Sequence, residues 1–126
     1  MHKPLLKKNF AAIVALLVAS FALPQQMYAQ DNYDMEIIGT RVNSLNCKDL
    51  STIDGVSGTV TFDPATNTLT LENATIKTIG PECVGLESLI KDLTINVVGN
   101  NSITSESYWG LFNDKNCNIT IKGSGK

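Results

Sequence analysis

A short phrase of Leu or Ile, then Thr, then Leu or Ile occurs three times in the second half of the chain. The copies begin at Leu69, Leu93 and Ile119, so their residue numbers differ by 24 (93 − 69) and 26 (119 − 93). A Gly-Leu pair recurs between them at Gly85 and Gly110, where the difference is 25 (110 − 85). Such a period is typical of stacked repeat architectures, in which each repeat forms one layer. The sequence therefore predicts a β-solenoid with about 25 residues in each coil.

An asparagine recurs near the same period. Asn73 and Asn100 each stand three positions before an isoleucine, and their residue numbers differ by 27 (100 − 73). An asparagine at matching places in a stack can bond the local turn or form an amide ladder with the neighbouring layer. Contact with a sugar or a cation is the alternative. We expect the internal role for Asn73, and Asn100 is kept as a candidate ligand-binding residue.

Successive side chains of a strand point to opposite faces, so the first and third residues of each triplet should share one face. We expect these residues in the core, and we expect the threonines between them to form a ladder on the outer face. The expected ladder is Thr70, Thr94 and Thr120. The expected core positions are Leu69, Leu71, Leu93, Ile95, Ile119 and Ile121.

Short β-branched runs separated by Gly, Asn, Asp and Pro predict an all-β chain without an amphipathic helix. Residues 58–62 and 68–71 flank the turn formers Asp63 and Pro64, which predicts an antiparallel hairpin. Residues 30–57 are expected to form an N-terminal strand and loop, and residues 58–126 the hairpin and the start of the coils. Leucine-rich repeats have a similar period, but they need a leucine three positions before each triplet. Thr66 and Asn116 occupy two of these three positions.

Residues 1–29 have the layout of a secretory signal peptide. Three lysines precede an uncharged apolar stretch at residues 10–23, and a polar segment follows that ends at Ala29. The apolar stretch is shorter than the roughly 20 residues of a membrane-spanning helix. We therefore expect cleavage after Ala29 and export to the periplasm, the cell surface or the medium, with no membrane insertion after cleavage.

Charge and residue inventory exclude several function classes for the exported chain. Without residues 1–29 it carries 7 basic side chains (10 − 3) against 12 acidic ones, a net charge of −5. Nucleic acid and anionic membranes bind preferentially to clusters of Lys and Arg, so neither is an expected partner. The single histidine, His2, leaves with the leader, which excludes Ser-His-Asp and Cys-His catalysis and histidine-rich metal sites.

Three cysteines, Cys47, Cys83 and Cys117, are an odd number for an exported protein and match no zinc or redox spacing. Two states of the cysteines are compatible with this count: three small buried thiols, or one disulfide and one free thiol.

About two full coils are present, whereas roughly three or more usually make a stable stack. We therefore expect an N-terminal fragment of a longer protein, or self-association through the open strand edge.

Residues 55–126 carry a resemblance to a known family, in the segments "GVSGTVTFDPATNTLTLENATI", "VGLESLIKDLTINVVGNNSI" and "WGLFNDKNCNITIKGSGK". They are similar to repeats of the bacterial carbohydrate-binding β-helix family whose founding type binds polygalacturonate with calcium. The resemblance implies a right-handed parallel β-helix, no catalytic activity, and binding of acidic, pectic polysaccharide through calcium. The family's acidic calcium clusters have no contiguous counterpart in this sequence.

Tyr108 and Trp109 precede a glycine in a polar loop, and aromatic faces stack on sugar rings. They are the main candidate ligand contacts, with ordinary packing as the alternative. Five acidic residues are dispersed rather than spaced as calcium ligands, and we expect solvated surface positions for them: Glu72, Glu87, Asp92, Glu106 and Asp114.

The sequence predicts a non-catalytic polysaccharide-binding module. A structural or adhesive stalk without a glycan ligand is the alternative. A polysaccharide lyase fragment is a third hypothesis. By resemblance to β-helix lyases such an enzyme would use a basic residue, commonly arginine, and the only arginine, Arg41, lies upstream of the repeats.

Overall fold

The computed structural model describes residues 30–126, and the predicted signal peptide lies outside this part of the chain. Residues Asp31–Lys126 form one compact unit. Its strands are β1 (Asn32–Ile37), β2 (Thr40–Asn43), β3 (Val56–Asp63), β4 (Thr68–Lys77), β5 (Leu86–Ser88), β6 (Asp92–Val98), β7 (Ser102–Thr104), β8 (Leu111–Asn113) and β9 (Asn118–Lys122). The one helical element of the described chain is the single 3₁₀ turn η1 (Leu50–Thr52). The prediction of an all-β chain is confirmed.

The N-terminal segment forms a hairpin, β1–β2, where the sequence predicted one strand and a loop. Ile37 and Thr40 are register partners, so Ile38 and Gly39 make a tight turn between the strands. Both have positive φ, 48° and 73°, which is the backbone geometry that suits the twist of a tight hairpin. A β-branched residue rarely adopts such a φ. The side chain of Ile38 is buried.

The predicted β3–β4 hairpin is confirmed. Phe62 pairs with Leu69 and Asp63 with Thr68 in antiparallel register. In the turn, the Asp63 carboxylate accepts a hydrogen bond from the Ala65 N–H at 2.9 Å, as expected for a side chain that closes a local turn.

Strands β4, β6 and β9 stack in parallel. Leu69 lies beside Ile95, and Ile95 lies beside Ile121, so the residue numbers of stacked partners differ by 26 at both steps (95 − 69 and 121 − 95). The predicted equivalence of Leu69 with Leu93 is therefore wrong by two positions. A slip of two keeps every side chain on its own face, so the hydrophobic alternation cannot distinguish the two registers.

The same slip changes the threonine ladder. Thr68, not Thr70, lies beside Thr94, and Thr94 lies beside Thr120. Thr70 is the register partner of Asn96, so its predicted place in the ladder is wrong.

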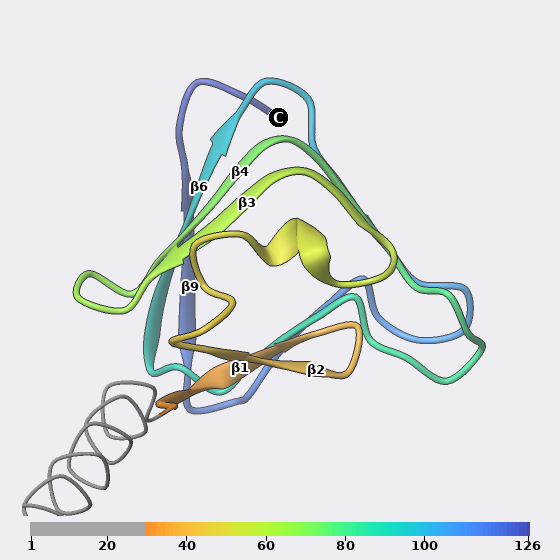
Figure 1. Cartoon of the computed structure of the whole chain (residues 1–126), viewed down its shortest axis with the longest axis horizontal. Helices are drawn as coiled ribbons and strands as arrows, with labels where there is room; N and C mark the ends of the chain where they lie inside the picture. The colour runs from red at the N-terminus through yellow and green to blue at the C-terminus, as the bar shows by residue number, and fades with distance from the viewer. Residues whose placement is uncertain (1–29) are drawn as a thin grey trace, which may run out of the picture. The chain divides into compact units, whose positions relative to one another are not determined.

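Two more parallel pairs continue the arrangement. Leu86 of β5 lies beside Leu111 of β8, one repeat further along the chain. Ile76, in the second half of β4, lies beside Ile103 of β7, again about one repeat later. Residues 31–126 wind around a triangular outline, with β6 and β9 on one side and β1 and β2 on another (Figure 1).

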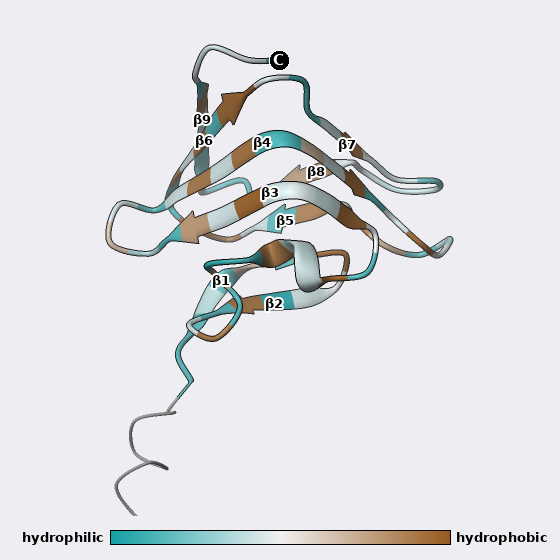
Figure 2. Cartoon of the chain, turned by 45° about the horizontal axis from the view of Figure 1, so that its top comes forward, coloured by the Kyte–Doolittle hydropathy of each residue, from teal (hydrophilic) through white to brown (hydrophobic). Residues whose placement is uncertain are grey.

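The core lies inside this outline. Hydrophobic and hydrophilic residues alternate along β3, β4 and β6 (Figure 2). Among the predicted core residues, Leu69, Leu71, Leu93 and Ile95 are buried. Ile119 is half-buried and Ile121 is 61% exposed, because β9 is the outer strand of its sheet. The predicted core position of Ile121 is therefore wrong.

The other end of the stack is covered by the N-terminal segment. The turn η1 packs against β3, and Leu50 within it is fully buried. Figure 1 shows this turn over the middle of the triangular outline. No helix within residues 30–126 combines the length and the apolar character needed to cross a membrane.

Candidate functional site

A row of four outward side chains crosses the sheet β2-β1-β5-β8. Arg41 pairs with Glu36, Glu36 with Glu87, and Glu87 with Phe112. On β1 and β5 the neighbours of this row, Met35, Ile37, Leu86 and Ser88, are buried, so the row itself faces away from the core. Two glutamates and an aromatic ring are thus placed side by side by strand register alone.

Next to this row stands a group of exposed aromatic rings. Trp109 packs on Phe112 with ring centroids 5.3 Å apart, and Tyr108 stacks on Trp109 at 6.1 Å with an interplanar angle of 18°. Tyr108 is 51% and Trp109 is 59% exposed. Exposed aromatic faces fixed side by side offer an apolar surface at low entropic cost to a ligand.

Backbone and side-chain hydrogen bonds fix the loop that carries these rings. The Ser105 hydroxyl donates to the Cys83 carbonyl at 2.7 Å and accepts from the Tyr108 N–H at 3.2 Å. The Trp109 carbonyl accepts from the Gly85 N–H at 3.2 Å. These hydrogen bonds attach residues 105–109, the aromatic loop, to residues 83–85 about one repeat earlier. The backbone that carries the two rings is therefore fixed.

These residues line a groove with a volume of about 260 Å³. Its walls come from β1 and the β1–β2 turn, from the segment before β5 together with β5, and from the aromatic loop. The lining residues are Glu36, Gly39, Glu82, Cys83, Val84, Glu87, Tyr108 and Trp109. The groove combines a stacked aromatic wall with three carboxylates, and no Lys or Arg lines it.

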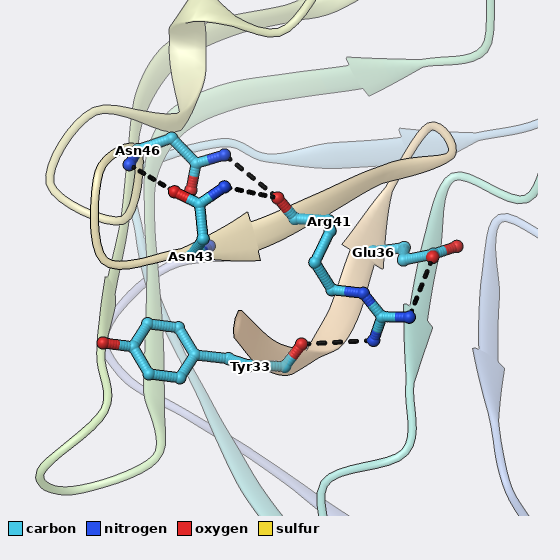
Figure 3. Close-up of polar contacts among 5 residues, drawn as sticks. All are labelled: Tyr33, Glu36, Arg41, Asn43 and Asn46. Carbon is cyan, nitrogen blue, oxygen red and sulfur yellow. Dashed lines mark hydrogen bonds and ion pairs between the residues drawn. The ribbon is translucent and has the colours of Figure 1, made fainter. Parts of the chain in front are cut away.

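Arg41 neutralises one of the three carboxylates. Its Nη2 lies 3.2 Å from Glu36 Oε1, and its Nη1 donates to the Tyr33 carbonyl at 3.2 Å (Figure 3). The Asn46 amide donates to the Arg41 carbonyl at 3.1 Å, which fixes the backbone behind it. This is the only ion pair within residues 30–126, so Glu82 and Glu87 carry no cationic partner in that part of the chain.

Asn100, a predicted ligand residue, lies elsewhere. Its backbone N–H donates to Asn73 Oδ1 at 3.1 Å, and it is not among the groove residues. Asn73 thus has an internal role as expected, but its side chain bonds a backbone N–H one repeat later and not a neighbouring amide side chain. Sequence reasoning missed Asn101, whose Oδ1 accepts from the Ala74 N–H at 2.8 Å and whose Nδ2 donates to the Val98 carbonyl.

The five acidic residues that the sequence analysis described as dispersed do not come together at one site. Glu87 lines the groove, whereas Asp92 accepts from the Asn118 amide at 3.1 Å and Asp114 from the Asn116 N–H at 3.3 Å. Within residues 30–126 no three side chains of the metal-binding types are grouped so that they could hold an ion. The described residues therefore do not fit the calcium that the family resemblance implies.

All three cysteines are free thiols. Cys47 is buried, and Cys83 and Cys117 are half-buried. Cys83 lines the groove. The pKa of the Cys117 thiol is raised above its ordinary value, first by partial burial and then by the negative charges of Asp114, Asp92 and Asp34.

The sequence identified the aromatic pair but not the carboxylates beside it. Glu36 and Glu82 belong to segments without a repeat marker, and Glu87 was expected to be a dispersed surface residue. The antiparallel pairing of β1 with β5 places Glu36 opposite Glu87, although the two are far apart in the sequence. The one available signal was the alternation in "MEI" and "LES", which puts both glutamates on outward faces.

Comparison with known proteins leaves the family open: no protein-family model, no curated protein and no solved structure matches this chain.

Proposed function

We propose that this chain is an exported, non-catalytic module that binds polysaccharide. The observation that supports this most is the stacked, half-exposed pair Tyr108 and Trp109 at the wall of a groove. The C–H faces of a pyranose ring pack on aromatic faces, and polar groups at the rim can bond its hydroxyls. A groove of about 260 Å³ has room for one or two sugar units of a longer polymer.

We further propose that the parallel stack is the beginning of a right-handed parallel β-helix. Three observations support a parallel β-helix: the similar sequence offsets between the partners of every parallel pair, the placement of these pairs on more than one side of the outline, and the N-terminal cap. The right hand of the helix is what the family resemblance implies. The groove would then lie at the capped end of the helix.

A structural or adhesive stalk is the second candidate. It is favoured by β9, whose outer edge pairs with no strand in the described chain and presents Ile121. Such an edge can accept a further strand, from a longer chain or from another copy. The lyase hypothesis has less support, because the guanidinium of Arg41 is engaged with Glu36 and with the Tyr33 carbonyl.

Affinity electrophoresis in gels that contain soluble polysaccharides tests the proposal. We expect retardation in at least one neutral or charged polymer, and a loss of about tenfold or more in affinity for Trp109→Ala. Leu45→Ala is the matched control, because it removes an exposed apolar side chain outside the groove. Migration unaffected by every polymer, with concentration-dependent association in sedimentation, would favour the stalk.

A further inference from the structure

The charge around the aromatic pair restricts which sugars the groove can accept. Of its three carboxylates, Glu36 is paired with Arg41, and Glu82 and Glu87 are not paired with any cation of the described chain. Neither of these two carboxylates is buried: Glu82 is exposed and Glu87 is half-buried. Both are therefore solvated in the free protein, and both line the same groove as the aromatic wall.

An anionic sugar is a poor ligand for this arrangement. A uronate carboxylate in the groove would approach two like charges with no lysine or arginine in the lining to offset them. Within residues 30–126 no three side chains of the metal-binding types form a preformed cation site that would offset this repulsion. The groove therefore disfavours the acidic glycans that the family resemblance implies.

Both the carboxylates and the aromatic rings of the groove favour a positively charged sugar. A protonated amine donates charge-assisted hydrogen bonds to carboxylates, and these are stronger than bonds between neutral groups. An ammonium group is also attracted to the face of an indole or phenol ring. The aromatic stack and the unpaired glutamates are independent observations, on different strands and loops, and they select the same ligand charge.

We propose that the groove selects glycans whose sugars carry a free, protonated amino group, with Trp109 and Tyr108 packing on the ring and Glu82 and Glu87 pairing with the amine. This specificity rests on the proposed polysaccharide-binding function. It requires no metal ion, and the four side chains that it uses, Glu82, Glu87, Tyr108 and Trp109, all line the groove.

Titration calorimetry with three oligosaccharides of equal length tests the selectivity. The ligands are a fully deacetylated glucosamine oligomer, its N-acetylated counterpart and an oligogalacturonate. We expect the deacetylated oligomer to bind at least about tenfold more tightly than the N-acetylated one, and the oligogalacturonate to bind weakest. Added salt should weaken the first interaction most.

The double variant Glu82→Gln/Glu87→Gln supplies the second arm. It keeps side-chain size and removes the charge, so we expect it to abolish the preference for the deacetylated oligomer. Glu72→Gln on β4, outside the groove, is the matched control and should keep the preference. An unchanged melting temperature would show that all the variants are folded.

The two failures are distinguishable. Equal binding of the N-acetylated and deacetylated oligomers, lost in Trp109→Ala, would overturn the charge selectivity and leave the polysaccharide-binding function standing. Preferential binding of the oligogalacturonate would also overturn the selectivity. No binding of any of the three, by a folded protein, would overturn the selectivity for this polymer class, and the wider panel of polysaccharides would then decide the function.

Discussion

The Oδ1 atom of Asn73 accepts a hydrogen bond from the backbone N–H of Asn100 at 3.1 Å, and the two residues are 27 positions apart. Asn73 stands in the middle of β4 with φ of 46°, between the half that pairs with β6 and the half that pairs with β7. The residue therefore does two things at once: it turns the strand at a corner and it bonds the next layer. An added Cβ at Gly99 would overlap its Oδ1, so the glycine makes room for this contact.

Substitutions at Asn73 separate these two contributions. Asn73→Gly loses the hydrogen bond and keeps a residue that accepts positive φ, so we expect a loss of about 1 kcal/mol in the free energy of unfolding. Asn73→Ala loses the same bond and adds left-handed strain, so we expect about 1 kcal/mol more. Urea denaturation measures both. A glycine variant less stable than the alanine variant would contradict this account of the corner.

The stacking register makes a second prediction. Ile95 is buried between Leu69 and Ile121, and truncation to alanine should cost about 2 to 5 kcal/mol. Ile121, on the outer strand, is 61% exposed, and Ile121→Ala should change stability by less than about 0.5 kcal/mol. Chemical denaturation of the pair is the measurement. Similar losses for the two variants would mean that β9 is covered in solution, as by a further layer or a second copy.

The raised pKa of the Cys117 thiol predicts slow alkylation. At a pH near the ordinary thiol pKa, less thiolate is present at Cys117 in the folded protein than in the unfolded chain, so its reaction with iodoacetamide should be slower than in denaturant. Asp114→Asn should lower this pKa and speed the reaction only in part, because partial burial is the larger cause of the shift. Mass spectrometry of the Cys117 peptide follows the reaction. A folded-state rate equal to that in denaturant would contradict the shift.

The same shift has a consequence for stability against pH. A group whose pKa is raised on folding binds its proton more tightly in the folded state. Its contribution is fully present below the ordinary thiol pKa and is lost as the pH rises through the raised value. We expect Cys117→Ser to remove this part of the loss of stability in alkaline solution, which denaturation at neutral and at alkaline pH can measure.

Cys83 offers a probe of the groove within the same chain. Its thiol lines the groove, whereas Cys117 lies outside it. A bound oligosaccharide should therefore slow the alkylation of Cys83 and leave the rate at Cys117 unchanged, as followed peptide by peptide in one sample. Equal slowing of both thiols would indicate general stabilisation, and unchanged rates at saturating ligand would place the binding site elsewhere.

Local pattern was sufficient for the all-β class and for the β3–β4 hairpin, but not for the β1–β2 hairpin or for the short strands β5, β7 and β8. Alternation identified Leu69 and Ile95 as core residues, and Asp63 with Pro64 identified the β3–β4 turn. The register between layers was missed, because a slip of two positions leaves the buried face unchanged. The contact of Asn73 with Asn100 joins the layers at a corner, and an approximate repeat period does not specify it.

The candidate site was only half visible in the sequence. Two adjacent aromatic residues in a polar loop are a local signal, and they line the groove. The carboxylates reach the same groove through the β1–β5 pairing, which is antiparallel and outside the repeat. No local pattern encodes a non-repeating pairing of this kind, so the charge of the site appears only in the folded chain.

The fluorescence of Trp109 tests the central claim most directly, because this residue is the only tryptophan in the chain. Titration with a fully deacetylated glucosamine oligomer should change its emission intensity and wavelength in a saturable manner, with the N-acetylated oligomer requiring at least about tenfold higher concentration. The Glu82→Gln/Glu87→Gln variant should remove that difference. Emission that stays constant while calorimetry records binding would contradict a site at Trp109.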